Sequence, residues 1–246
     1  MAGTSGPATS KPERPRRLAR HVRRRHRVAG PEPVPARPDP TGVRMSKPRG
    51  REQTSPYGKL PAGEALERLI EIRPDTVLDV GSGAGIHARH MREAGLSVTT
   101  LDIAPPADIV TDFRTWRLPR EYGAVWASHV LEHQPDPGEF LRHCFGLIRE
   151  GGWFAVTVPP LKHDIVGGHV TLWNAGLLLY QLILAGFDCA QARVGTYAYN
   201  ISVIVQKRSR PEVPLVFDTG DIETLAPFFP LPVKHGFCGQ IPDVRW

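Results

Sequence analysis

The pattern of apolar and polar positions between residues 61 and 207 predicts alternating helices and strands. Over 61–72 a helical spacing places Leu66, Leu69 and Ile70 on one face. The predicted strands are 76–80, 97–101, 108–110, 123–127 and 153–158. The predicted helices between and after them are 84–94, 137–148 and 172–185. The last two apolar segments, 187–196 and 198–207, predict an antiparallel hairpin, so we expect an α/β fold with a doubly wound sheet.

The two ends of the chain differ from this middle part. Residues 1–55 are rich in Arg and Pro and nearly lack aromatic and branched apolar side chains, so they cannot form a core and are predicted to be disordered. Residues 56–208 are expected to form the domain. Residues 209–246 are rich in proline, yet they hold several aromatic side chains, and we expect them to pack on the domain as an extension.

Charge is concentrated in the N-terminal segment. Residues 1–55 contain 14 Lys or Arg and 4 Asp or Glu, whereas the whole chain has a net charge of +6. The remaining residues are therefore net acidic, and the body gives no signal of nucleic-acid binding. The basic tail is either solvated or a docking arm for phosphates or an anionic surface. Three widely spaced cysteines, no apolar signal segment and no long apolar run predict a cytoplasmic protein without a membrane span.

A glycine loop carries the most specific chemistry. After the apolar strand around Asp79, glycine occupies every second position, at Gly81, Gly83 and Gly85. Such a loop brings backbone N–H groups close to a ligand and leads into a helix N-terminus. In the dinucleotide-binding fingerprint G-x-G-x-x-G the third glycine would fall where Ile86 stands, so the loop is not predicted to bind a dinucleotide.

The motif D-x-G-x-G-x-G resembles the first motif of class I S-adenosylmethionine (SAM)-dependent methyltransferases. The resemblance implies a seven-stranded sheet in the order 3-2-1-4-5-7-6 with the last strand antiparallel. It also implies SAM as cofactor and S-adenosylhomocysteine as product. In that family the loop of Gly81, Gly83 and Gly85 passes under the methionine part of SAM, and the acid at the position of Asp79 acts near its amino group.

Two further acids follow predicted strands. Asp102 lies 19 residues beyond Gly83 at the end of a strand, where a carboxylate can accept both ribose hydroxyls of an adenosine ligand. Alternatively, it caps a turn. By resemblance, Asp112 meets the adenine amino group and the backbone N–H of Phe113 meets a ring nitrogen. Asp112 could equally begin a turn before Arg114.

The fourth strand runs into the sequence Ser128-His129-Val130-Leu131-Glu132-His133. It resembles a signature of the ubiquinone/menaquinone-type branch of small-molecule methyltransferases, which implies that Ser128 and His129 lie beside the methyl donor and bind the cofactor. The same residues match H-x-x-E-H, a zinc-protease motif that requires a helix. A strand precedes the motif and proline follows it closely, so we expect no metal site.

The segment 159–174 resembles the substrate lid of that branch. His163 and His169 are the predicted catalytic bases, because a hydroxyl acceptor must lose its proton; alternatively, they cap turns in a polar loop. The predicted function is methyl transfer from SAM to a small molecule, preferentially at oxygen, with a sugar or glycan-pathway compound as a narrower guess. The alternatives are a nucleic-acid or protein methyltransferase that uses the basic tail, and a SAM-binding protein without catalysis.

Overall fold

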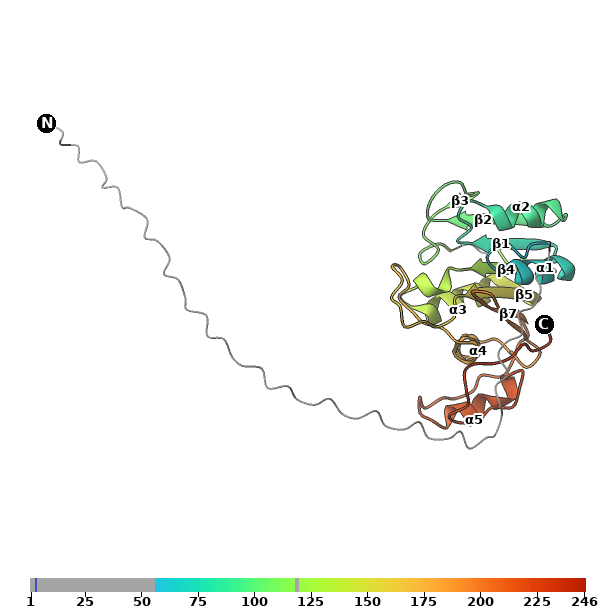
Figure 1. The fold of residues 1–246 in the computed structure, drawn as a ribbon, viewed down its shortest axis with the longest axis vertical. Coiled ribbons are helices and arrows are strands. Elements are labelled where there is room, and N and C mark those ends of the chain that lie inside the picture. Colours follow the sequence, from blue (N-terminus) through green and yellow to red (C-terminus); the bar gives the residue numbers. More distant parts are fainter. Residues whose placement is uncertain (1–2, 4–55, 118–119) are drawn as a thin grey trace. The chain divides into compact units, whose positions relative to one another are not determined.

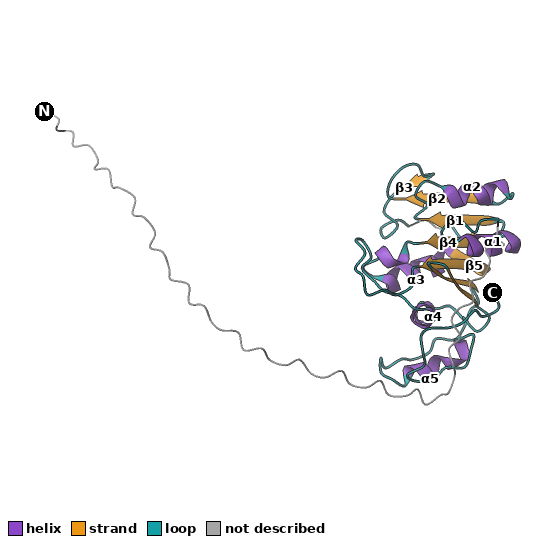
Figure 2. Ribbon diagram, in the orientation of Figure 1, coloured by secondary structure: helices purple, strands orange, loops and turns teal. Residues whose placement is uncertain are grey.

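The structure is a computed structural model that describes residue 3 and residues 56–117 and 120–246. The predicted tail of residues 1–55 therefore lies outside the described residues, apart from Gly3. Residues 56–246 form a layered α/β structure with helices against both faces of one sheet (Figures 1 and 2). No helix of this described part is long and apolar enough to cross a membrane.

The sheet has seven strands in the order β3-β2-β1-β4-β5-β7-β6. The strands are β1 (Thr76–Val80), β2 (Ser97–Asp102), β3 (Ile109–Val110), β4 (Tyr122–Ser128), β5 (Ile148–Val158), β6 (Arg193–Tyr197) and β7 (Asn200–Gln206). The first five pair in parallel, and β7 runs antiparallel to both β5 and β6. The predicted strand order and the reversed last strand are confirmed.

Two apolar layers fill the space between the sheet and its helices. The helices are α1 (Gly63–Ile72), α2 (Ile86–Glu93), α3 (Pro137–Leu147), α4 (Ala175–Leu184) and α5 (Asp221–Leu225). One layer joins Leu66 and Leu69 of α1 to Met91 of α2 and to Trp126 of β4. The other lies under α3 and α4 and includes Leu141. Parallel strands buried on both faces explain why the predicted strands are almost continuously apolar.

Some boundaries differ from the prediction. Helix α4 begins at Ala175 instead of residue 172, because the Asn174 side chain accepts a hydrogen bond from the Leu177 N–H and caps the helix. Strand β5 begins at Ile148, five residues early, since Tyr122 pairs with Ile148 before the register shifts. Strand β6 begins only at Arg193.

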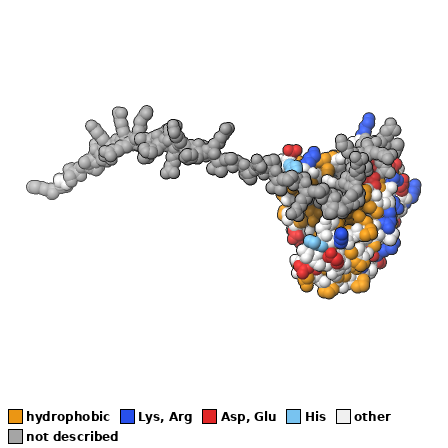
Figure 3. All heavy atoms as spheres, turned by 60° about the horizontal axis from the view of Figure 1, so that its bottom comes forward, with side chains coloured by type: hydrophobic (Ala, Val, Ile, Leu, Met, Phe, Trp, Pro, Cys, Tyr) orange, Lys and Arg blue, Asp and Glu red, His pale blue; other side chains and the backbone are white. Residues whose placement is uncertain are grey.

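The C-terminal extension contacts the domain at its last residues. Val194 and Val244 exchange two backbone hydrogen bonds of 2.9 Å. Trp246 stacks on Tyr197 with ring centroids 5.6 Å apart, and its indole N–H donates to Glu64 of α1. On the face shown in Figure 3, basic and acidic side chains of the described residues are interspersed.

Candidate active site

The three glycines of the loop between β1 and α2 have left-handed backbones, with φ of 70° at Gly81, 51° at Gly83 and 69° at Gly85. A Cβ atom at Gly81 would collide with the Val130 side chain, whereas Cβ atoms at Gly83 and Gly85 would meet nothing within 4 Å. The first glycine is therefore required by packing. The other two turn their open sides outward, which leaves room for a ligand against the backbone.

Asp79 belongs to β1, two residues before the first glycine of the loop, and is only 2 % exposed. Burial raises the pKa of its carboxyl to about 7; the positive charge of Arg92 opposes this shift and the negative charge of Asp102 adds to it. Its Oδ2 atom has no hydrogen-bond partner among the described residues, and neither has the buried Oγ atom of Ser82 or Ser128. Buried polar atoms without partners are costly, so these atoms suit polar ligand groups, and the ionised Asp79 carboxyl suits a positively charged one.

Asp102 ties the glycine loop to the end of β2. Its Oδ2 accepts from the Gly83 N–H at 2.8 Å, and its Oδ1 accepts from the Ala104 N–H at 3.0 Å. The carboxylate thus caps a turn, as one of the two alternatives expected. Each carboxylate oxygen can accept a further hydrogen bond, so the capping leaves ribose binding possible as well.

Asp112 and Phe113 are placed differently. The Asp112 carboxylate accepts from the Arg114 N–H at 2.9 Å and pairs with the Arg114 guanidinium at 2.7 Å, which is the turn considered as its alternative. Phe113 is buried and stacks on His143 with ring centroids 4.3 Å apart. Neither lines the main cavity, and their roles at adenine stay predictions.

A cavity of about 780 Å³ opens beside the glycine loop. Of the predicted cofactor-binding residues, Gly81, Ser128 and His129 line it. The rest of the wall comes from residues of the segment 58–64 around the start of α1, from Ser82, Ala84, Ile86 and His87, and from the turn between β6 and β7 at 197–200. Sequence motifs did not indicate this turn. Its position follows from topology, because antiparallel β7 begins where parallel β4 and β5 end.

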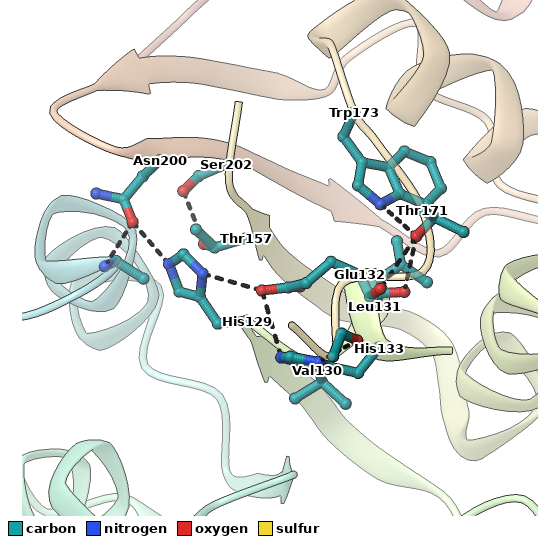
Figure 4. Close-up of polar contacts among 12 residues, drawn as sticks. His129, Val130, Leu131, Glu132, His133, Thr157, Thr171, Trp173, Asn200 and Ser202 are labelled. Atoms are coloured by element: carbon teal, nitrogen blue, oxygen red, sulfur yellow. Dashed lines mark hydrogen bonds and ion pairs between the residues drawn. The ribbon is translucent and has the colours of Figure 1, made fainter. Parts of the chain in front are cut away.

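His129 links three elements at the cavity wall (Figure 4). Its Nε2 lies 2.9 Å from Asn200 Oδ1, and its Nδ1 lies 3.1 Å from Glu132 Oε1. Asn200 Oδ1 also accepts from the backbone N–H of Ala62, a group that can only donate. Because the Ala62 N–H requires an acceptor, the Asn200 side-chain amide is oriented with its oxygen toward Ala62 and His129. His129 Nε2 therefore carries a proton and donates it to that oxygen. His129 itself has a left-handed backbone with φ of 56°, a strained conformation for a non-glycine residue.

We expect His129 to stay protonated above its ordinary pKa. Burial alone would lower its pKa, but the hydrogen bonds to Glu132 and Asn200 and the charge of Glu132 outweigh it, so the pKa is raised from 6.5. The resulting stabilisation is complete below pH 6.5 and is lost as pH rises through the folded-state pKa. NMR of the imidazole nitrogens should show two N–H groups at pH 6.5, and Glu132→Gln should lower the titration midpoint. A neutral ring at pH 6.5 in the wild type would contradict this network.

His87, another cavity residue, is held in the neutral form. Its Nε2 lies 2.9 Å from the Pro61 carbonyl and must donate to it, while Nδ1 accepts from the Trp126 indole N–H at 3.4 Å. Burial lowers the pKa of His87. The ring therefore connects α2 to the start of α1 and has no free nitrogen lone pair.

The two predicted bases lie outside the cavity. His163 is exposed and His169 is half-buried, both in the loop between β5 and α4. His169 instead lies edge-on to His133, with ring centroids 5.0 Å apart. Their catalytic role stays a prediction and requires this loop to move toward the cavity.

The H-x-x-E-H sequence does not form the zinc-protease geometry. Residues Leu131–His133 form a single 3₁₀ turn instead of an α-helix, and the His129 ring contacts Asn200. A different group, Glu132, His133 and His169, has potential metal-ligand atoms within 4.8 Å of one another.

Comparisons with known proteins agree with this fold. A family model described as a methyltransferase domain matches residues 51–185. A ubiquinone biosynthesis O-methyltransferase from Nitrosomonas europaea is 32% identical over 96 residues, which is 32% of this chain and 41% of that protein. The corresponding protein from Bordetella bronchiseptica is 34% identical over 95 residues, 31% of this chain and 39% of that protein. The chain thus spans less than half of the length of these relatives.

Solved structures show the same fold. A Burkholderia thailandensis 1,6-didemethyltoxoflavin-N1-methyltransferase, solved with S-adenosylhomocysteine, has a TM-score of 0.51 and 19% identity, covering 59% of this chain and 79% of its own. The [4+2]-cyclase SpnF has a TM-score of 0.50 and 15% identity, covering 65% and 85%. At such identities the likeness establishes the fold alone. The family model covers more than half of the chain, and the chain belongs to the methyltransferase domain family of class I SAM-dependent enzymes.

Proposed function

We propose that this protein transfers the methyl group of SAM to an oxygen atom of a small-molecule acceptor. The observation that carries the proposal is that three buried polar atoms lack described partners, Asp79 Oδ2, Ser82 Oγ and Ser128 Oγ, and that Ser82 and Ser128 line the cavity of about 780 Å³. A cavity of that size is within the usual range for small-molecule sites.

The residues fit the cofactor. The buried carboxylate of Asp79 would hold the ammonium group, Asp102 would hold the ribose, and the open sides of Gly83 and Gly85 would leave room for the rest. SAM supplies a methyl group activated by its sulfonium. The adenine contacts of Asp112 and Phe113 remain part of the proposal.

The acceptor side is supported by the wall opposite the loop. Leu60, Pro61, Tyr197 and Tyr199 give it apolar and aromatic surface, and Lys59 and Glu64 add charge. These residues suit a compact acceptor with an apolar face. The choice of oxygen is supported by the names of the relatives, which are O-methyltransferases. A sugar or glycan-pathway acceptor is the narrower hypothesis.

Transfer to a hydroxyl is an in-line displacement: the acceptor oxygen forms a bond to the methyl carbon, the carbon–sulfur bond breaks, and the hydroxyl proton leaves to a base. The protein mainly has to align the two partners and exclude water. His163 and His169 are the proposed bases, on a loop that would close over the cavity. The segment 209–246 is proposed to support the domain of residues 56–208 by holding Tyr197 and Glu64 through Trp246.

Two other functions are alternatives to methyl transfer to a small molecule. A nucleic-acid or protein methyltransferase would use the basic residues of 1–55 for docking. On the face in Figure 3, the basic and acidic side chains of the described residues are interspersed, and no basic stripe suited to a nucleic acid is visible there. A SAM-binding protein without methyl transfer would have the same loop and cavity, and the fold is shared with a cyclase.

Deleting residues 1–44 is expected to leave methyl transfer to a small acceptor unchanged, because the cavity and glycine loop lie entirely beyond them. The assay is transfer of label from radioactive SAM to a panel of phenols, catechols and sugars, with RNA and a basic protein as macromolecular substrates. Labelling of a macromolecule alone, lost on deletion, would favour the docking-arm function. No labelling of any acceptor by a protein that binds SAM would favour a non-catalytic role.

A further inference from the structure

We propose that Glu132, His133 and His169 form a binding site for a divalent transition-metal ion of the zinc type. The side chains come from the turn after β4 and from the loop between β5 and α4, and their ligand atoms lie within 4.8 Å of one another. The site lies outside the glycine loop, but it shares His169 with the proposed methyl transfer. A metal-bound His169 cannot act as a base, so His163 is the base when the metal site is occupied.

His133 has the hydrogen-bond partner that a metal-binding histidine needs. Its Nδ1 lies 2.8 Å from the backbone carbonyl oxygen of Gly168. A carbonyl can only accept, so Nδ1 carries the proton and Nε2 keeps a lone pair. That Nε2 atom is 3.9 Å from Glu132 Oε1. A carbonyl that orients a histidine in this way is the usual partner behind a metal-bound imidazole.

Glu132 provides a buried anionic ligand. The residue is 0 % exposed, and its carboxylate lies between the His129 and His133 rings (Figure 4). Oε1 is within hydrogen-bond distance of His129, but Oε2 is buried and has no partner in the described part of the chain. A bound cation would satisfy the oxygen that the protein leaves unpaired.

His169 is brought to this carboxylate by the backbone beside it. The N–H of Val170, the next residue, donates to the Glu132 carbonyl at 2.9 Å. The His169 ring then lies edge-on to His133 and half-exposed, so an ion can enter from solvent. This hydrogen bond fixes the backbone beside His169 to Glu132, so the two proposed ligands stay close together.

The spacing and chemistry favour zinc over magnesium. Bound ligand atoms would be about 2.0–2.2 Å from zinc, so the side chains must rotate inward slightly, which the exposed imidazoles allow. Two imidazoles and one carboxylate suit Zn²⁺ or Co²⁺, whereas Mg²⁺ prefers oxygen ligands. The H-x-x-E-H motif would make His129 and His133 the two histidine ligands. In the structure the His129 ring contacts Asn200, and His169 is the second histidine beside Glu132 and His133.

Calorimetric titration of the full-length, metal-free protein with ZnCl2 tests the site, with MgCl2 as a comparison. We expect one zinc site that is lost, or weakened by about tenfold or more, in His133→Ala and His169→Ala. His169→Cys should retain zinc binding, because a thiolate also ligates zinc. His163→Ala is the matched control, since it removes an exposed histidine of the same loop outside the group.

Circular dichroism of each variant confirms that loss of binding is not loss of folding. Equal zinc affinity in the wild type, His133→Ala and His169→Ala would overturn the proposal, as would absence of zinc binding by the folded wild type. SAM titrated into the same samples reports on the glycine loop independently, so failure of the metal site and failure of the proposed function are distinguishable.

Discussion

Asp79→Asn is expected to stabilise the folded protein above pH 7 and to weaken SAM binding at the same pH. The buried carboxyl has a pKa raised by burial from 3.8 to about 7, so its ionised form destabilises the folded state. That shift corresponds to at most about 4 kcal/mol in the free energy of unfolding. Loss of a buried charge partner for the SAM ammonium should reduce SAM affinity tenfold or more.

The pH dependence separates these two effects. Because the folded-state pKa is raised, the contribution of Asp79 to stability is fully present below pH 3.8 and is lost as pH rises through about 7. Asparagine mimics the protonated acid, so the variant and the wild type should be equally stable below pH 3.8, diverge between pH 3.8 and about 7, and differ by a constant amount at higher pH. SAM affinity should rise with pH through about 7 in the wild type only.

Urea unfolding and calorimetry at several pH values measure both effects. Asp102→Asn is the control for stability, because that carboxylate is half-exposed and hydrogen-bonded. A stability difference between Asp79→Asn and the wild type that does not change with pH would show that the Asp79 carboxyl does not titrate as its burial requires.

Gly83→Leu is expected to abolish measurable SAM binding while the protein still folds. The Cβ position of Gly83 is open, so the new side chain displaces nothing of the protein and instead occupies the space against the loop where the cofactor is proposed to lie. The left-handed backbone, with φ of 51°, adds a stability cost of about 1–2 kcal/mol for a side chain.

Two other glycines make this experiment specific. Gly236→Leu places a leucine in an equally open, left-handed position, with φ of 78°, within the C-terminal extension and away from the cavity lining. It should have a similar stability cost and retain SAM binding. Gly81→Ala should destabilise the protein itself, because its Cβ meets Val130. Retained SAM affinity in Gly83→Leu would place the cofactor away from the loop.

Much of the fold and the donor side could be predicted from the sequence. Parallel strands buried on both faces give unmistakable apolar runs, and the glycines mark the one loop where backbone must approach a ligand. The strand order and the methyltransferase family were both confirmed. Asp79 was singled out by its motif, and the structure adds that it is buried and that its Oδ2 lacks a described partner.

The rest of the site depends on tertiary contacts that leave no local pattern. Asn200 has no motif around it, yet its side chain orients His129 and bonds Ala62, which lies 138 residues away in sequence. His169 is predicted as a base because it is a histidine in a polar loop, and only the structure shows that its neighbours are His133 and Glu132. The acceptor wall combines the residues before α1 with a hairpin turn, and only the folded sheet brings them together.

Calorimetric titration of the full-length protein with SAM and with S-adenosylhomocysteine tests the central claim most directly. We expect that both bind to one site, that Gly83→Leu removes binding of both, and that Asp79→Asn weakens binding of both, because each ligand carries the ammonium group. Absence of binding by the folded protein, at ligand concentrations far above usual cofactor affinities, would contradict it.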